Sequence, residues 1–253
     1  MRALFVGLGS IGGRHLTNLT DLCRRRGIAL EVTALRATRR PLQEDIAAMV
    51  HRQVFSLDEC EAYDVAFVTN PTHLHAPIIG GLSGRIGTFF IEKPLFECTD
   101  YSLDALGLSC EQKAYVAAPM RWCGVYQALR KKLEGLPVYS VRAICSSYLP
   151  GWRPGADYRE VYSARREMGG GVALDLIHEW DYLTNLFGLP LESRSLAGKY
   201  PHLEINADDL AIYISKYTDF LCELHLDYFG RTYRRCVEIF TEEGTLEADF
   251  GTG

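Results

Sequence analysis

The fold is predicted from Leu4-Phe5-Val6-Gly7-Leu8-Gly9-Ser10-Ile11-Gly12, a stretch close to the start of the chain. Its apolar residues Leu4–Val6 predict a buried strand, and the spacing of later apolar residues predicts a helix from Gly12 to about Arg26. The glycines between them match the pattern GxGxxG, which binds dinucleotides when it joins a strand to a helix. The stretch therefore predicts a dinucleotide-binding turn. A glycine-rich turn that binds nothing is the alternative.

Each glycine of this motif has its own physical reason. Gly7 permits the tight turn, Gly9 lets the backbone approach a pyrophosphate, and Gly12 lets the helix pack closely on the strand. Ser10 and Ile11 lie between Gly9 and the predicted helix, whose N-terminal N–H groups attract an anion. These five residues are the predicted pyrophosphate-binding residues.

The end of the second predicted strand, Leu30–Leu35, indicates which nicotinamide cofactor is bound. An acidic residue about 20 positions beyond the glycines holds the ribose 2′-hydroxyl of NAD. Here the strand runs instead into Arg36-Ala37-Thr38-Arg39-Arg40. Arginine pairs with phosphate and threonine can donate a hydrogen bond to it, so Arg36, Arg39 and Arg40 together with Thr38 predict NADP(H) as the preferred cofactor, with NAD(H) as the alternative. A solvated basic loop is the other interpretation.

The rest of residues 1–120 alternates short apolar runs with longer mixed segments. This alternation predicts a parallel sheet covered by helices on both faces, and so a dinucleotide-binding domain of the α/β class over residues 1–120. The further elements expected here are a helix over Leu42–His51 and strands over Val65–Thr69, Thr88–Ile91 and Ala114–Ala117.

Beyond a predicted helix at Gly124–Glu134, the pattern changes to several strands in succession. Such a succession favours a mostly antiparallel sheet with a helix on one face, here a substrate-binding domain of the α+β class over residues 121–253. The expected strands are Val138–Tyr148, Leu210–Lys216, Leu221–Tyr228 and Arg235–Thr241, and the expected helix is Gly171–Phe187.

Composition excludes several other classes of protein. Of the 253 residues, 47% are hydrophobic and 23% charged, as in ordinary globular proteins. No apolar run reaches the about 18 residues of a membrane span, and the run at Ala3–Val6 is too short for a signal peptide. A net charge of −5 disfavours nucleic acid as a partner. The eight cysteines include no CxxC pair, so we expect no metal site, reduced thiols and a cytoplasmic location.

Two short motifs follow predicted strands of the first domain. Thr69–His75 follows one strand, and Glu92-Lys93-Pro94 follows the next. Since ligands bind at the carboxyl ends of central parallel strands, Lys93 is predicted to point into the ligand crevice and Thr69–His75 to line it. Ordinary surface loops also contain such sequences, and this is the alternative for each motif taken alone.

The segment Gly169–Asp181 carries the candidate acid–base chemistry. Three glycines precede a predicted helix in which Asp175, His178 and Asp181 are spaced three residues apart, so that they share one face. A carboxylate beside a histidine fixes its tautomer, as in a general acid or base. A helix with a satisfied polar face is the alternative.

Residues 146–159 mix Trp, Tyr and Arg with turn residues. Such side chains stack on sugar rings and bind acidic groups, whereas a structural loop that covers the helix is the alternative. The candidate substrate-binding residues are Trp152, Arg153 and Tyr158 of this loop, together with Arg121 and Asp181.

Four motifs in this order resemble the Gfo/Idh/MocA oxidoreductases, the family of glucose–fructose oxidoreductase and inositol dehydrogenase. The motifs are Gly7-Leu8-Gly9-Ser10-Ile11-Gly12-Gly13-Arg14-His15, Asn70-Pro71-Thr72-His73-Leu74-His75, Glu92-Lys93-Pro94 and Gly169–Asp181. The resemblance covers nearly the whole chain. It implies an N-terminal Rossmann domain, a C-terminal α/β domain with an open, mostly antiparallel sheet, and a nicotinamide cofactor. It also implies a sugar, cyclitol or related polyol as substrate, and a homodimer or homotetramer that forms through the open sheet face.

The same resemblance places Lys93 beside the nicotinamide and substrate, and gives Asp175 and His178 substrate binding and proton transfer. The residues assigned to the cofactor from these motifs are Asn70, Pro71, His75, Glu92 and Lys93. Many relatives space the Asp and His by four residues, which makes Asp181 a reserve candidate. Relatives also run on for some tens of residues beyond the position of Gly253. The aromatic loop looks like that of a subgroup associated with bacterial surface sugars.

The resulting hypothesis is an oxidoreductase that transfers a hydride between the nicotinamide and a sugar-like alcohol. His178 takes or gives the hydroxyl proton, Asp175 orients it or the substrate, and Lys93 favours negative charge on the substrate oxygen. Two alternatives stay open: a non-catalytic cofactor-binding regulator, and an NAD(P)-dependent glycoside hydrolase that restores its cofactor in each cycle.

Overall fold

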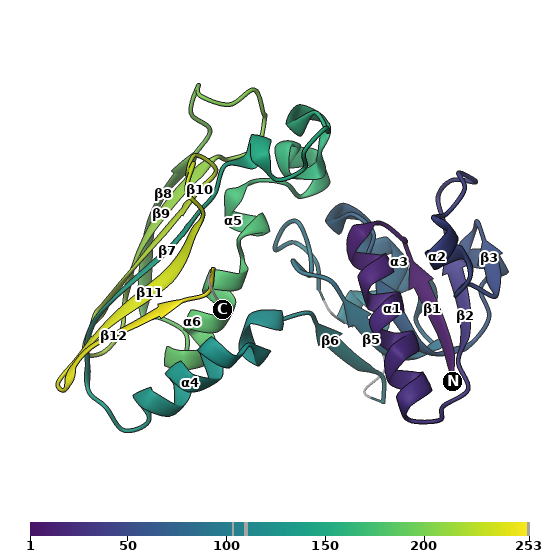
Figure 1. Cartoon of the computed structure of the whole chain (residues 1–253), viewed down its shortest axis with the longest axis horizontal. Helices are drawn as coiled ribbons and strands as arrows, with labels where there is room; N and C mark the ends of the chain where they lie inside the picture. The colour runs from purple at the N-terminus through teal and green to yellow at the C-terminus, as the bar shows by residue number, and fades with distance from the viewer. Residues whose placement is uncertain (103, 109–110, 252–253) are drawn as a thin grey trace. The chain divides into compact units, whose positions relative to one another are not determined.

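The computed structural model describes residues 1–102, 104–108 and 111–251, and the chain divides into two compact units, Met1–Ala117 and Ala118–Gly253 (Figure 1). The described strands of each unit form one six-stranded sheet. Seven cysteines are free thiols, and Cys110 lies outside the described residues. Every helix in the described part of the chain is too short or too polar to cross a membrane.

The first unit contains a parallel sheet in the strand order β3-β2-β1-β4-β5-β6. The chain leaves β1 toward one edge and later returns to its other side, so the order reverses between β1 and β4, where such sheets bind ligands. The strands are β1 (Arg2–Val6), β2 (Glu31–Leu35), β3 (Arg52–Val54), β4 (Tyr63–Val68), β5 (Ile86–Ile91) and β6 (Lys113–Val116). The α-helices are α1 (Ser10–Arg25), α2 (Glu44–Ala47) and α3 (His75–Leu82), with 3-10 turns at Leu57–Glu59, Thr72–Leu74 and Asp104–Leu106.

Alternate residues of β1 feed two core layers, one on each face of this sheet. Phe5 packs in one layer with Leu16 of α1, and Leu4 packs in the other with Ile79 of α3. All four side chains are fully buried. The predicted sheet with helices on both faces is therefore confirmed.

Three elements of the first unit differ from the prediction. The helix expected over Leu42–His51 is the single turn α2, because His51 returns to the sheet. The N–H of His51 donates to the Val32 carbonyl (2.9 Å), and its Nδ1 accepts from the Val32 N–H (3.1 Å). Strand β3 and helix α3 were not predicted. The strand has only three residues at the sheet edge, and the helix contains Pro77 and two glycines, which usually mark turns.

The second unit contains a sheet in the order β12-β11-β7-β10-β9-β8. Among its described strands β7 and β10 pair in parallel and the other neighbours are antiparallel, so the predicted mostly antiparallel sheet is confirmed. The strands are β7 (Val138–Ser146), β8 (Glu192–Gly198), β9 (Leu210–Lys216), β10 (Leu221–Asp227), β11 (Arg234–Thr241) and β12 (Gly244–Asp249). The α-helices are α4 (Gly124–Leu133), α5 (Val172–Asp175) and α6 (His178–Phe187). The 3-10 turns are Pro119–Trp122, Leu149–Gly151, Tyr158–Glu160, Tyr162–Ala164 and Arg166–Met168. The two edge strands, β8 and β12, lie outside the predictions.

The helices of this unit cover one face of its sheet (Figure 1). Val141 of β7 and Leu224 of β10 pack there in one core with Tyr182 and Leu183 of α6. The register places alternate residues of β8, β9 and β10 together on the other face. The large apolar side chains exposed on that face are Leu196, Ile212, Ile214 and Leu221.

The helix predicted over Gly171–Phe187 is broken in the middle. Helix α5 ends at Asp175, Leu176 leaves the helical conformation at φ −96° and ψ 28°, and α6 begins at His178. Asp175 therefore lies on a different helix from His178 and Asp181, and the single helical face predicted for these three residues is wrong. His178 and Asp181 remain one turn apart on α6.

Candidate functional site

The glycine turn between β1 and α1 is closed on its inner side and open at one point. Gly7 has φ +85°, and a Cβ there would lie 3.2 Å from the Asn70 backbone. A Cβ on Gly12 would lie 2.4 Å from the Gly7 carbonyl oxygen, whereas a Cβ on Gly9 would meet no described atom within 4 Å. The space at Gly9 is what the approach of a pyrophosphate to the backbone requires, so this turn fits a dinucleotide.

The electrostatics of the same turn also suit an anion. Helix α1 begins after Gly9 with no capping side chain and no acidic residue in its first turn. Its first N–H groups have no acceptor within the helix, and the helix dipole adds positive potential there. The Thr69 hydroxyl lies 3.0 Å from the Val6 carbonyl oxygen and 2.6 Å from that of Gly7, and so holds the ends of β1 and β4 together. Thr69 was quoted in a motif, but this role was not predicted.

The end of β2 is basic in the structure. Nη1 of Arg36 donates to Oε1 of Gln53 (2.7 Å), and Nη2 donates to the Arg40 carbonyl. The Arg39 guanidinium lies 4.1 Å from the centre of the Phe55 ring. Arg36 is thus held by Gln53 of β3, and Arg39 lies against Phe55, the residue that follows β3.

His75, predicted as a cofactor-binding residue, is fully buried. Its Nε2 lies 2.9 Å from the Asn70 carbonyl oxygen, and its Nδ1 lies 3.1 Å from that of Leu95. The buried ring thus lies between the segment after β4 and the segment after β5. In this structure the ring therefore presents no exposed surface to a ligand.

His75 is expected to make the protein less stable as the pH is lowered. Burial lowers the pKa of His75 below its ordinary value of 6.5, although its two carbonyl contacts act in the opposite direction. Below pH 6.5 the unfolded chain therefore binds a proton that the folded chain does not, so stability is present above this pH and is lost below it. The slope contributed by one such group is at most about 1.4 kcal/mol per pH unit.

Urea unfolding at pH values above and below 6.5 measures this change in unfolding free energy. The variant His75→Gln lacks the titrating group and is expected to show a flatter dependence of unfolding free energy on pH than the wild type. Equal slopes in the two proteins would show that His75 does not carry the effect.

The Glu92-Lys93-Pro94 motif lies at the end of β5, next to the end of β4. The N–H of Glu92 donates to the Val68 carbonyl (2.9 Å), and the Glu92 carboxylate lies 2.6 Å from Nε2 of His15. Lys93 follows directly and is half-buried. The first unit thus brings the glycine turn, the Asn70 segment and the Lys93 segment to the carboxyl ends of three neighbouring strands.

In the second unit, Asp175 is held by two tyrosines. Its carboxylate accepts hydrogen bonds from the hydroxyls of Tyr162 and Tyr228, the latter at 3.0 Å. Asp175 is 4% exposed. Burial, and next the Asp175 charge, raise the pKa of both phenols, so that both remain protonated donors. Neither tyrosine was a predicted site residue, and for Tyr228, which lies 53 positions from Asp175, the sequence offers no local signal.

Two predicted substrate-binding residues, Arg121 and Asp181, pair with each other. Nε of Arg121 donates to Oδ2 of Asp181 (2.9 Å), and Nη2 donates to Oδ1 (2.6 Å). The hydrogen bonds with Asp181 raise the pKa of Arg121. This bidentate pair fixes the segment before α4 against α6, one helical turn from His178.

The aromatic loop packs against the tyrosines that hold Asp175. The ring of Trp152 packs edge-on against Tyr228, with 5.3 Å between ring centres, and its Nε1 donates to the Ser147 hydroxyl (3.1 Å). The guanidinium of Arg153 lies 5.9 Å from the centre of the Tyr162 ring. Trp152 and Arg153 of the loop thus pack on the two tyrosines that bond Asp175.

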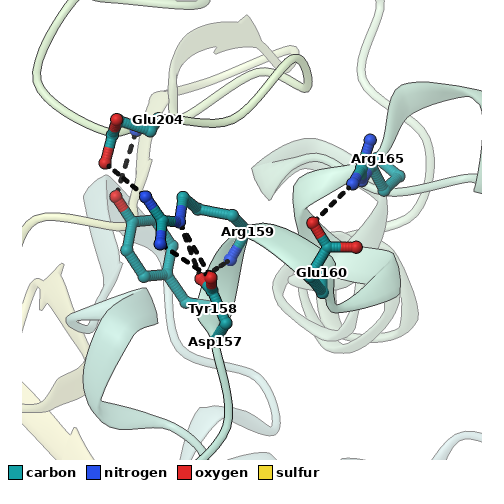
Figure 2. Close-up of polar contacts among 6 residues, drawn as sticks. All are labelled: Asp157, Tyr158, Arg159, Glu160, Arg165 and Glu204. Carbon is teal, nitrogen blue, oxygen red and sulfur yellow. Dashed lines mark hydrogen bonds and ion pairs between the residues drawn. The ribbon is translucent and has the colours of Figure 1, made fainter.

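Figure 2 shows what Tyr158, another predicted substrate-binding residue, contacts. Its hydroxyl accepts from the N–H of Glu204 (3.2 Å), and the neighbouring Arg159 pairs with both Asp157 (2.8 Å) and Glu204 (3.2 Å). The structure therefore uses this end of the loop to connect it with the segment around Glu204. Gly170 allows the protein's own backbone, not a ligand, to approach closely, since a Cβ there would lie 2.2 Å from the Tyr162 carbonyl oxygen.

Comparison with known proteins bears on the fold. No family model matches the chain, and no curated protein shows significant similarity to it. The WlbA dehydrogenase from Bordetella pertussis, in complex with NADH and UDP-GlcNAcA, is similar with a TM-score of 0.80 and 20% identity, over 97% of this chain and 76% of that one. The myo-inositol 2-dehydrogenase from Lactobacillus plantarum is similar with a TM-score of 0.78 and 19% identity, over 98% and 76%.

A levoglucosan dehydrogenase in complex with NADH and levoglucosan has a TM-score of 0.81 and 17% identity, over 99% of this chain and 73% of that one. At such identities the similarity establishes the fold. The chain therefore has the two-domain dehydrogenase fold implied by its resemblance to the Gfo/Idh/MocA oxidoreductases.

Proposed function

We propose that this protein is an NAD(P)-dependent oxidoreductase that acts on a CH–OH group of a sugar, cyclitol or related polyol. The glycine turn carries the proposal, because Gly9 is open to a ligand while Gly7 and Gly12 admit no side chain. The similar structures support it, since two of them are dehydrogenases in complex with NADH together with UDP-GlcNAcA or levoglucosan.

Residues of each unit receive separate roles in this proposal. When bound, the nicotinamide supplies or accepts the hydride. Gly9 and the first turn of α1 bind the pyrophosphate, and the Lys93 ammonium stabilises negative charge on the substrate oxygen. His178 takes or gives the hydroxyl proton. The two tyrosine hydroxyls hold the Asp175 carboxylate in place. Asp175 therefore orients His178 or the substrate and does not carry a mobile proton.

Fluorescence titration with NADPH and, separately, NADH tests the proposal, with Gly9→Ala as the matched variant. The wild type is expected to bind cofactor saturably. In Gly9→Ala the added methyl group has open space, so folding is expected to be unchanged while cofactor affinity falls by roughly tenfold or more. Absence of saturable binding by the folded wild type would overturn the proposal.

Turnover then separates an oxidoreductase from a regulator or a glycoside hydrolase. A steady change in nicotinamide absorbance with one member of a panel of sugars, polyols and nucleotide sugars is expected only from an oxidoreductase. The similarity to the WlbA complex with UDP-GlcNAcA supports nucleotide-sugar acids as the first choices in the panel. A place in surface-sugar biosynthesis rests on the aromatic loop of residues 146–159.

Arg36→Asp is expected to shift cofactor preference from NADPH toward NADH. The substitution places a carboxylate where NAD-binding proteins use one for the ribose 2′-hydroxyl, and it repels a 2′-phosphate. NADPH affinity is expected to fall at least roughly tenfold, whereas NADH affinity is maintained or improved. Arg25→Asp, at the far end of α1, makes the same change in charge and serves as control. An unchanged preference in Arg36→Asp would remove Arg36 from the 2′-phosphate site.

We also infer a homo-oligomer that uses the open face of the second sheet. The exposed side chains of Leu196, Ile214 and Leu221 on that face support this inference. Light scattering of the purified chain measures the state, and a monomer at micromolar concentration would contradict it. The cytoplasmic location stays a prediction.

A further inference from the structure

A histidine of helix α1 is bonded to the motif that carries Lys93. His15 lies about one turn beyond Gly12 on α1, and Glu92 directly precedes Lys93 after β5. Nε2 of His15 lies 2.6 Å from Oε1 of Glu92, and the two side chains are only 19% and 13% exposed. A contact between residues 77 positions apart thus connects the nucleotide-binding helix with the Lys93 segment.

Aromatic rings fix the orientation of His15. Its ring packs edge-on against Phe90, with 5.1 Å between ring centres, and tilted against Phe67 at 5.9 Å. Phe67 in turn stacks on Phe5 at 4.6 Å. These rings exclude water from one side of the His15–Glu92 pair, and a hydrogen bond to a carboxylate is stronger in such surroundings.

The Lys93 segment is held on its other side by a second histidine. Nδ1 of the buried His75 lies 3.1 Å from the Leu95 carbonyl oxygen. The segment is therefore anchored at Glu92, before the lysine, and at Leu95, after it. The Leu95 anchor leads back to the segment after β4, whereas the Glu92 anchor leads to the helix whose N-terminus faces the cofactor in the proposed function.

We propose that His15 is a positioning residue for Lys93. Acting through Glu92, it holds the Lys93 segment at a set distance from the N-terminal end of α1, and so places the lysine relative to a cofactor bound there. Glu92 is then the connection between helix and lysine rather than a ligand of the cofactor. The consequence for turnover rests on the proposed function, whereas the effect on the Lys93 segment does not.

Three variants separate the hydrogen bond from the packing. His15→Phe keeps an aromatic ring against Phe67 and Phe90 but has no nitrogen to bond Glu92. His15→Gln keeps a nitrogen donor at nearly the reach of Nε2. Glu92→Gln keeps the shape of the side chain and removes its charge.

The first readout needs neither cofactor nor substrate. Each variant is treated with limiting acetic anhydride, and the acetylation rate of Lys93 is measured by mass spectrometry relative to the exposed Lys131 of α4. Loosening of the segment in His15→Phe and Glu92→Gln is expected to raise the relative rate about threefold or more, and His15→Gln is expected to stay close to the wild type. An unchanged relative rate in His15→Phe and Glu92→Gln would overturn the proposal.

The second readout is the division between turnover and cofactor affinity. His15→Phe is expected to lower kcat at least about tenfold while NADPH affinity stays within about twofold, and His15→Gln is expected to restore most of the turnover. If His15→Phe lost cofactor affinity in step with kcat, the proposal would be overturned. The His15–Glu92 pair would then act on cofactor binding itself and not on the position of Lys93. A wild type that binds no cofactor, together with the expected acetylation rates, would support the positioning and overturn only the proposed function.

Discussion

Replacement of His178 by alanine is expected to lower turnover by roughly 10²–10⁴-fold while affinity for NADPH changes little. That factor is the usual contribution of a positioned side chain that transfers a proton in the transition state. His178 is the half-buried first residue of α6, and the Arg121–Asp181 pair fixes this helix one turn further along. Its loss therefore removes the proposed proton carrier from a segment that remains in place.

The measurement compares kcat with the dissociation constant for NADPH in the same preparation. His202→Ala is the control, because His202 is an exposed histidine of the second unit that packs on Phe229. It is expected to retain normal turnover. If His178→Ala lost turnover and cofactor affinity to the same extent, His178 would not be the acid or base.

Removal of Arg235 alone is expected to destabilise the second unit by about 3–5 kcal/mol. Nε of Arg235, on β11, lies 2.8 Å from Oε1 of Glu179 on α6, and these side chains are 15% and 0% exposed. Arg235→Met leaves the carboxylate of Glu179 in the core without its cation. Loss of one partner of a buried pair costs this much because the other charge stays desolvated.

Urea unfolding of the single and double variants measures this cost. Arg235→Met combined with Glu179→Leu is expected to recover most of the loss, because apolar residues often replace a buried ion pair with little change in stability. An exposed pair supplies the comparison: Arg194 lies 2.6 Å from Glu192 with 86% and 52% exposure, and Arg194→Met is expected to cost less than about 1 kcal/mol. A cost for Arg235→Met no larger than that would refute the argument.

The Glu179–Arg235 pair also lies beside the candidate acid or base. Glu179 follows His178 in the chain, so the ion pair anchors the start of α6 to β11. Partial loosening of the pair is therefore expected to disturb His178 as well as stability.

The sequence by itself determined the turn between β1 and α1. Gly7, Gly9 and Gly12 act through the backbone of a few consecutive residues, so their spacing was enough to predict both the turn and its space for a ligand. The alternation of strands and helices also predicted the two sheets, because burial of strands produces apolar runs that are visible in the chain. The basic segment after β2 was also predicted from the sequence, because its arginines are close together in the chain.

Only the tertiary structure decided the surroundings of the candidate acid–base residues. Even spacing predicted one helix through Asp175 and His178, whereas hydrogen bonds from Tyr162 and Tyr228 hold Asp175 on a separate short helix. His15 belonged to a quoted motif, but its bond to Glu92 forms only because the folded sheet brings α1 over β4 and β5, where His15 packs on Phe67 and Phe90. Such contacts join residues tens of positions apart, and they form only when strand order and core packing bring the side chains together. Local spacing carries no record of them, which is why the sequence indicated the chemistry and the fold decided the partners.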